Sequence, residues 1–268
     1  MLIWMTAMLC EARPVIEHFG LKKSHDHHAF EVYQSEDTIC VVSGIGSLPM
    51  AAATAWIAAL NRREKTLGWI NLGLAGGMEE LGRLYRIVKI RDSISGKHYY
   101  PMTPFKTKLD YQTCETVSQP SCDYKIDRVF DMEASAYFAT ASRFSTAEFI
   151  HSLKVVSDNP VEKTGKNEPR SSELITRNLP RIIAFAEQLR GLLFQSDQIG
   201  INRFRLERWL AAARYTQSQQ SMLQTHLAYL LNRGYDEAEL LNRFKDENDG
   251  RRILKELKTL CIQDSRNL

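Results

Sequence analysis

The sequence has few features that would tie it to a membrane, an oxidising compartment or nucleic acid. Its 268 residues carry a formal net charge of only +3, which does not by itself argue for a nucleic-acid partner. No stretch approaches the roughly 18 consecutive apolar residues of a membrane span. The first fourteen residues have neither the basic region nor the cleavage site of a signal peptide. We therefore expect a cytoplasmic protein without a membrane span.

Cysteines and ligand-binding motifs are equally sparse. The five cysteines form no CxxC pair, and Cys10 and Cys40 lie in apolar, strand-like runs, so we expect free buried thiols rather than disulfides. The histidine-rich segment 25–28 has no partner cluster elsewhere, which favours a solvated loop over a metal site. The glycine-containing segments match neither a P-loop nor a dinucleotide fingerprint. The sequence thus predicts no metal and no cofactor.

The first two thirds of the chain contain an alternation of short apolar strands with helices. Helices are expected to begin near residues 11 and 47 and to cover residues 130–144. Strands are expected over residues 2–8, 38–46, 68–78, 83–94, 112–119 and 151–160. This order is typical of an α/β protein with a largely parallel central sheet.

Three of these strands end in small or polar residues. In open α/β sheets, ligands bind beyond the carboxyl ends of the strands. We therefore expect the ends at residues 43–46, 73–77 and 157–159 to meet at one site, with the start of the helix over 130–144 at the same rim.

The last quarter of the chain has a different pattern. Its leucines and aromatic residues recur at helical spacing with no strand signal. We expect one domain over residues 1–195 and a helical extension over 196–268, with breaks near Gly200, Gly234 and Gly250. The extension either packs its apolar side on the first domain or on another subunit, or recruits a partner enzyme.

Five segments carry a resemblance to a known family. In chain order they are "AMLCEARP", "VVSGIGSLPMAAAT", "INLGLAGGM", "FDMEASA" and "VVSDNP", all within residues 1–190. Together they resemble the nucleoside phosphorylases and the methylthioadenosine/S-adenosylhomocysteine nucleosidases. The resemblance implies a three-layer αβα fold, a homo-oligomer, and cleavage of an N-glycosidic bond through an oxocarbenium-like transition state. Such a reaction needs a proton for the leaving base, a nucleophile at the anomeric carbon and acceptors for the sugar hydroxyls.

The resemblance assigns these roles to particular side chains. Asp158 would protonate the base, Glu11 would position the attacking water, and Met132 and Glu133 would hold the ribose. A carboxyl group in an apolar pocket has a raised pKa, as a general acid needs. Each acid also has a structural interpretation: Asp158 in an Asx turn, Glu11 at a helix N-terminus, and Asp131 in the first turn of the helix over 130–144.

The same resemblance suggests further substrate contacts. Three residues of the glycine-containing loop would lie beneath the base: Ala75, Gly76 and Gly77. Val117 would line the base pocket, and Arg170 lies close to where phosphorylases keep an arginine that assists the acid.

One departure from the phosphorylase pattern bears on the nucleophile. Asn71 and Leu74 stand where phosphorylases have an arginine and a serine, and an uncharged loop binds phosphate poorly. Water is therefore favoured over phosphate, although Arg13 and Arg170 remain possible phosphate contacts.

These inferences give one leading hypothesis and two alternatives. The leading one is an N-ribosyl hydrolase that acts on a purine nucleoside or an adenosyl thioether. A phosphate-dependent nucleoside phosphorylase is the first alternative. The second is a protein that binds a nucleoside without turning it over, because the segment between residues 95 and 130 is shorter than is usual in the family and Leu74 replaces the family's serine. Tyr99, Tyr100 and Phe105 of that segment could stack on a base, although aromatic residues in a loop more often serve local packing.

Overall fold

The computed structural model describes residues 1–25, 29–61, 66–120, 126–162, 168–199 and 203–266. The strands are β1 Leu2–Thr6, β2 Lys22–Lys23, β3 Glu31–Gln34, β4 Thr38–Val42, β5 Gly68–Gly76, β6 Leu84–Asp92, β7 His98–Tyr99, β8 Asp110–Thr116, β9 Val129–Asp131 and β10 Ile150–Asp158. The helices are α1 Leu9–Phe19, α2 Ser47–Leu60, α3 Ala134–Ala141, η1 Ala147–Phe149, α4 Glu168–Ile199, α5 Arg203–Ala212, α6 Gln217–Asn232, α7 Glu237–Arg243 and α8 Gly250–Arg266. The chain divides into two compact units, residues 1–62 with 66–193, and residues 194–268.

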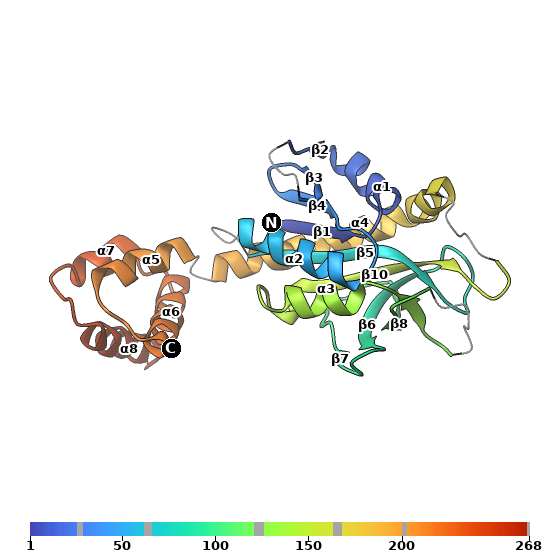
Figure 1. Ribbon diagram of the computed structural model, residues 1–268. Coiled ribbons are helices and arrows are strands. Elements are labelled where there is room, and N and C mark those ends of the chain that lie inside the picture. Colours follow the sequence, from blue (N-terminus) through green and yellow to red (C-terminus); the bar gives the residue numbers. More distant parts are fainter. Residues whose placement is uncertain (26–28, 62–65, 121–125, 163–167, 200–202, 267–268) are drawn as a thin grey trace. The chain divides into compact units, whose positions relative to one another are not determined.

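The first unit is built on a sheet with a parallel centre (Figure 1). β1 pairs in parallel with β4 on one side and with β5 on the other, and β5 also pairs in parallel with β10. The β1 residues are buried throughout, as expected for a parallel strand covered on both faces. The sequence-based expectation of a parallel central sheet is therefore confirmed.

Around this centre the pairing becomes mixed. β5, β9, β8, β6 and β10 pair in a closed ring, because β10 is hydrogen-bonded to both β5 and β6. Within the ring, β6 runs antiparallel to β10 and parallel to β8, and β9 runs antiparallel to β5. At the other side, β3 adds an antiparallel pair to β4.

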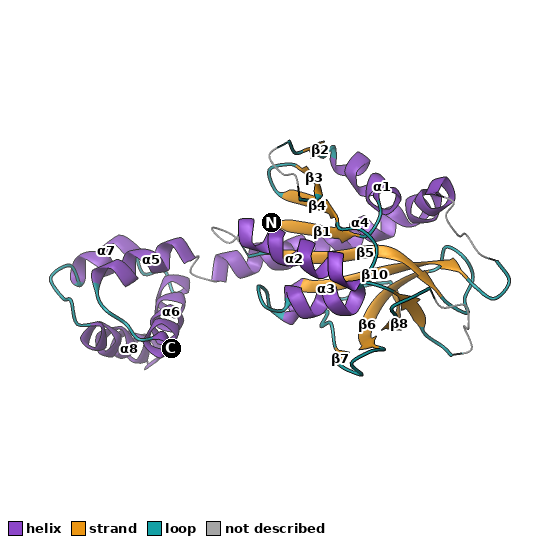
Figure 2. Cartoon of the chain, in the orientation of Figure 1, coloured by secondary structure: helices purple, strands orange, loops and turns teal. Residues whose placement is uncertain are grey.

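Helices cover both faces of the sheet, which confirms the three-layer αβα architecture (Figure 2). On one face, α1 and α4 bury Val15, Ile175 and Phe185 against Trp4 and Leu72 of the strands. On the opposite face, α2 and α3 pack apolar side chains against the sheet, including Ile57, Tyr137, Ile3 and Trp69. Gly20 ends α1 in the left-handed region at φ 59°, the C-terminal stop that the sequence predicts.

The prediction of a helix over residues 130–144 is wrong at both ends, because the observed helix begins later and ends earlier. Val129–Asp131 is strand β9, whose Asp131 pairs with Thr116 of β8, and α3 runs only from Ala134 to Ala141. Strand pairing holds the first residues in extended conformation, so Glu133 becomes the residue just before the helix. Asp131 therefore does not lie in a helical turn, contrary to its structural interpretation from the sequence.

The second unit has a hydrophobic core of its own. Helices α5, α6, α7 and α8 bury one large cluster: Trp209, Leu223, Leu227, Leu230, Leu240, Phe244, Ile253, Leu254 and Leu257. Two of the expected breaks are confirmed, since Gly234 follows α6 at φ 87° and Gly250 begins α8. The third, at Gly200, lies outside the described residues. None of the described helices is long and apolar enough to cross a membrane.

Candidate functional site

The strand ends meet in the first unit, around the last residue of β5. Gly76 is paired with Asp158 of β10 and with Phe130 of β9. The amide of Gly77 donates a hydrogen bond to the Asp158 carbonyl at 2.8 Å. The β10 end therefore lies directly beside the loop Ala75–Gly77, and the segment that carries Met132 and Glu133 begins from the other neighbour of Gly76.

Asp158 is the last residue of β10, and its carboxylate lies next to a hydroxyl group. The Ser157 Oγ donates a hydrogen bond to Asp158 Oδ2 at 2.6 Å. The Asp158 residue is only partly buried, so it can meet a ligand from solvent while its backbone is fixed in the sheet. The adjoining Asn159 accepts from the amides of Val161 and Glu162, so the turn expected at "SDNP" is formed by the asparagine.

Glu133 joins two elements that are far apart in sequence. Its Oε1 accepts a hydrogen bond from the Gly46 amide at 2.7 Å, and its residue is only 6% exposed. The Ser47 hydroxyl donates to the Met132 carbonyl at 2.9 Å. The start of α2 therefore holds the Met132–Glu133 pair at the rim, as the convergence of strand ends predicts.

Glu11 is fixed by backbone amides from two strand ends. Its Oε2 accepts from Ala7 N at 2.8 Å and from Met8 N at 3.0 Å, and its Oε1 accepts from Leu74 N at 2.9 Å. The residue is 3% exposed although it lies in the first turn of α1. Glu11 thus forms the expected helix N-terminal contacts and also reaches the end of β5.

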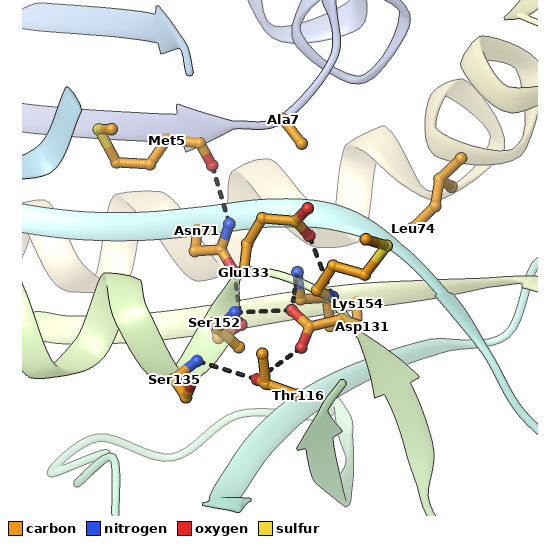
Figure 3. A network of polar contacts seen from close by, with 12 residues as sticks. Met5, Ala7, Asn71, Leu74, Thr116, Asp131, Glu133, Ser135, Ser152 and Lys154 are labelled. Atoms are coloured by element: carbon orange, nitrogen blue, oxygen red, sulfur yellow. Dashed lines mark hydrogen bonds and ion pairs between the residues drawn. The ribbon is translucent and has the colours of Figure 1, made fainter. Parts of the chain in front are cut away.

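A buried ion pair lies at the centre of this arrangement (Figure 3). Lys154 Nζ is 2.8 Å from Asp131 Oδ2, and neither side chain has more than 1% exposure. The other carboxylate oxygen of Asp131 accepts from the Thr116 hydroxyl at 2.7 Å, and Oδ2 also accepts from the Ala134 amide at 2.8 Å. The pair therefore ties β10, β9, β8 and the start of α3 together.

Three carboxylates share the single ammonium of this cluster. Burial acts to raise the pKa of Asp131, but the charge of Lys154 and the bonds from Thr116 and Ala134 lower it overall. Burial raises the pKa of Glu133 to about 7 against the opposing charge of Lys154, with Asp131 and Glu11 adding to the rise. Burial likewise raises the pKa of Glu11. Asp131 is therefore the ion-pair partner of Lys154, and Glu133 changes its charge near neutral pH.

Sequence reasoning missed Lys154 and misread Asp131. Lys154 lies in the apolar strand run "HSLKVVSD", where a lysine is ordinarily solvent-facing. The position of Lys154 within this apolar run could have indicated its role, because a charged side chain in a strand buried on both faces needs a buried partner of opposite charge. The choice of Asp131 over Glu11 or Glu133 as that partner depends on strand pairing.

Glu133 makes the free energy of unfolding depend on pH, because its pKa differs between the folded and unfolded states. Its folded-state pKa of about 7 lies above the ordinary carboxyl value of 4.5, so the folded state holds a proton that the unfolded state has lost between these pH values. Its contribution to stability is therefore fully present below about pH 4.5 and is lost as the pH rises through about 7. We expect Glu133→Gln to gain stability relative to the parent chain as pH rises from 5 to 7.5, measured by urea unfolding at each pH. A difference that stays constant over this range would contradict the assignment.

Gly73 allows Glu11 and Lys154 to approach the same strand end. A Cβ at Gly73 would lie 3.0 Å from Lys154 Nζ and 3.3 Å from Glu11 Oε1. We expect Gly73→Ala to lower the free energy of unfolding by about 1–3 kcal/mol through overpacking, because both neighbours are buried and fixed. Gly191→Ala is the matched control, since a Cβ at that position of α4 meets nothing within 4 Å. Equal stability of the two variants in urea unfolding would contradict the expectation.

The remaining residues suggested by the sequence occupy different surroundings. The Val117 amide donates to the Asp131 carbonyl at 2.8 Å, which places Val117 next to the ion pair. Arg170 forms an ion pair with Glu162, and both line a surface cavity of about 450 Å³. Arg13 is exposed on α1. The structure therefore places Val117, but not Arg13, in the vicinity of Asp131.

Asn71 and the aromatic residues near β7 have structural contacts. The Asn71 amide nitrogen donates to the Met5 carbonyl and its oxygen accepts from the Ser152 hydroxyl, each at 3.1 Å, so it cross-links β1, β5 and β10. The ring of Phe105 packs on that of Phe185, with 5.1 Å between the ring centroids, and the ring of Tyr99 packs on that of Phe138. Both rings are thus part of the internal packing.

The described cysteines are free thiols, as the sequence predicts. Cys10, Cys40 and Cys114 are free and buried, and Cys122 lies outside the described residues. Within the described ranges, no group of three or more His, Cys, Asp or Glu residues could hold a metal ion. Of the histidine-rich segment, residues 26–28 lie outside those ranges.

Comparisons with known proteins bear on the fold. No protein-family model and no curated protein matches the sequence. Solved structures do match: a 5′-methylthioadenosine/S-adenosylhomocysteine nucleosidase from Colwellia psychrerythraea in complex with adenine superposes with a TM-score of 0.56 at 16% identity, over 72% of this chain and 95% of that one. The Arabidopsis thaliana 5′-methylthioadenosine nucleosidase gives 0.54 at 16% identity, with the same coverage. A Chlamydia trachomatis nucleosidase gives 0.53 at 19% identity, over 69% of this chain and 97% of that one. The chain therefore has the nucleosidase fold that its sequence segments imply.

Proposed function

We propose that the protein is an N-ribosyl hydrolase that cleaves the glycosidic bond of a purine nucleoside or an adenosyl thioether. One observation carries the proposal. Gly76, at the end of β5, is paired with Asp158 on one side and with Phe130 on the other, and Leu74 of the same strand donates to Glu11. Asp158, Glu11 and the segment that leads to Glu133 therefore adjoin one strand end, which supports their proposed roles as acid, base and sugar acceptor.

Glu133 and Met132 are proposed to hold the ribose. Glu133 Oε1 is occupied by the Gly46 amide, whereas the contact that Oε2 makes in the described part of the chain is a longer one, of 3.3 Å from the Met132 amide. Sugar hydroxyls can therefore donate to Oε2, and hydrogen bonds to an ionised acceptor are about twice as strong as neutral ones. Because such bonds favour the carboxylate, ribose binding is expected to lower the pKa of Glu133 from about 7.

Asp158 and Glu11 are proposed to move the two protons of the reaction. As the bond between the anomeric carbon and the base breaks, its electron pair goes to the base, which takes a proton from Asp158. Water then forms a bond to the anomeric carbon and gives a proton to Glu11. The products are the free base and the free sugar, which is ribose for a nucleoside and a 5′-substituted ribose for an adenosyl thioether. The three backbone amides on Glu11 hold its carboxylate in place while it accepts that proton.

The neighbouring structures support the proposed substrate class. The Colwellia psychrerythraea nucleosidase was solved with adenine, and a Chlamydia trachomatis variant of the same fold was solved with MTA at 20% identity and a TM-score of 0.51. The proposed roles of Glu11, Glu133 and Asp158 are the ones that such substrates would need. A purine base, a homo-oligomeric assembly and a cytoplasmic location stay predictions from the sequence.

The test is release of free base from a panel of nucleosides. Adenosine, inosine, methylthioadenosine, S-adenosylhomocysteine and 5′-deoxyadenosine are incubated with the full chain, with and without phosphate, and the sugar product is identified. We expect free ribose, or its 5′-substituted form, without phosphate. A sugar 1-phosphate formed only with phosphate would instead establish a phosphorylase. Binding of these nucleosides with no release in either condition would establish the non-catalytic alternative. The Asp158→Asn variant, purified in parallel, controls for contaminating nucleosidase.

A further inference from the structure

A charged cavity lies on the face of β6 and β8 that points away from α3. Ile90 and Cys114 are buried in the core beneath α3, so the alternate residues of these strands face outward. Lys89 is paired with Thr113, and Arg91 with Glu115. β7 extends the same surface (Figure 1), with His98 opposite Arg91. The cavity has a volume of about 380 Å³ and is lined by Lys89, Arg91, Gly96, His98, Thr113, Asp127 and Arg128.

Positive charge exceeds negative charge in and around this cavity. Arg91 and Arg128 share one carboxylate, that of Glu115, whose Oε1 is 3.6 Å from Arg91 Nη1 and whose Oε2 is paired with Arg128. Asp127 accepts a hydrogen bond from the Gln112 amide at 2.7 Å. Lys89 has no ion pair among the described residues. Counting only the residues that the structure describes, three cations therefore lie near two carboxylates that are already engaged.

The donors suit an oxyanion with several oxygens. Two guanidinium groups held by one carboxylate present planar donor sets, which match phosphoryl oxygens better than a single ammonium does. The Thr113 hydroxyl adds a neutral donor, and Lys89 adds a charge that forms no ion pair within the described ranges. A volume of about 380 Å³ is within the range of small-molecule sites.

We propose that this cavity binds a small phosphate-bearing anion, at a site separate from the one formed by Glu11, Glu133 and Asp158. None of those three residues lines it. The connection to that site runs through the backbone, because Arg128 immediately precedes β9 and β9 ends at Asp131. An anion bound in this cavity would not decide whether water or phosphate attacks the anomeric carbon. Phosphate binding by itself therefore does not make the protein a phosphorylase.

The test is direct binding of inorganic pyrophosphate to the full chain by isothermal titration calorimetry. We expect saturable binding that weakens as salt increases, and a loss of affinity of about tenfold or more in Lys89→Glu, since a charge-assisted hydrogen bond is lost and a repelling carboxylate is added. Lys89 makes no ion pair in the described structure, so this variant should fold. Lys22→Glu is the matched control: Lys22 is exposed on β2, at the opposite end of the strand order from β6.

Three outcomes would overturn the proposal. One is the absence of saturable binding by the parent chain. Another is an equal loss in Lys89→Glu and Lys22→Glu, which would reflect net charge alone. The third is binding that survives in Lys89→Glu but is lost in Asp158→Asn, which would place the anion in the nucleoside site. Calorimetry reads binding without turnover, so the result does not depend on whether the chain proves to be a hydrolase.

Discussion

Replacing Lys154 by methionine is expected to lower the free energy of unfolding by about 3–5 kcal/mol, the usual cost of removing one partner of a buried ion pair. Asp131 would keep its bonds from Thr116 and Ala134 but would lose the ammonium at 2.8 Å. It could then stay ionised in a dry site or take up a proton, and both are unfavourable at neutral pH. Urea unfolding followed by circular dichroism measures the loss.

Two further variants separate the ion pair from general packing. Lys154→Met combined with Asp131→Asn removes both charges, so we expect the double variant to be more stable than Lys154→Met alone. Lys89→Met, at a position with no ion pair among the described residues, should stay within about 0.5 kcal/mol of the parent chain. A single Lys154→Met variant as stable as Lys89→Met would show that the pair does not hold Asp131 in place.

Replacing Lys154 by methionine should also raise the pKa of Glu133. Lys154 opposes the effect of burial on the pKa of Glu133. Without that ammonium, the pKa of Glu133 should rise further above 7, and the carboxylate that is proposed to bind ribose would form only at higher pH. Where the variant remains folded, its apparent affinity for a nucleoside should therefore have its optimum at higher pH than that of the parent chain.

Replacing Asp158 by asparagine is expected to reduce base release from a purine nucleoside by about 10²–10⁴-fold, the typical contribution of a general acid. The proposed acid lies at the end of β10, and its partner Ser157 can still donate to the asparagine oxygen. Because Asp158 is only partly buried, stability should change little. Steady-state kinetics should show the loss in kcat, since the interaction forms as the bond breaks.

A substrate that needs no proton provides the internal control. 4-Nitrophenyl β-D-ribofuranoside releases a stable phenolate, so Asp158→Asn should cleave it nearly as well as the parent chain does. Glu133→Gln should impair both substrates, because both carry the ribose that Glu133 is proposed to bind. Equal impairment of the two substrates by Asp158→Asn would show that Asp158 positions the sugar or the loop and does not protonate the base.

Local patterns were sufficient to predict most of the first unit. Apolar runs with helices between them predicted the strands β1, β4, β5 and β10, because a parallel sheet covered on both faces requires continuous apolar strands. The end of α1 at Gly20 and the break at Gly234 follow from backbone conformations that favour glycine, with φ of 59° and 87°. The prediction that the strand ends meet at one site required only that the strands be parallel, because the carboxyl ends of parallel strands lie at the same edge of the sheet.

The pairing of β9 could not be predicted in the same way. "FDMEASAYFA" has helical spacing, and nothing within it shows that its first residues pair with β8 and β5. That pairing depends on residues 15 or more positions away. It decides that Asp131 lies in a strand and that Glu133 stands just before α3.

The sequence by itself determined the order of the elements and the α/β class, because these depend on periodicity and on topology rules that act locally. The three layers and the acids at the strand ends followed from the resemblance of its segments to the nucleosidase family. Only the tertiary structure decided which acid pairs with Lys154. Three carboxylates lie near it: Glu11 comes from the start of α1, whereas Asp131 and Glu133 are two residues apart. In a buried site the one ammonium stabilises most the carboxylate that it touches. That contact, at 2.8 Å from Asp131, is set by strand register, and it leaves Glu133 with a pKa of about 7 beside the proposed ribose site.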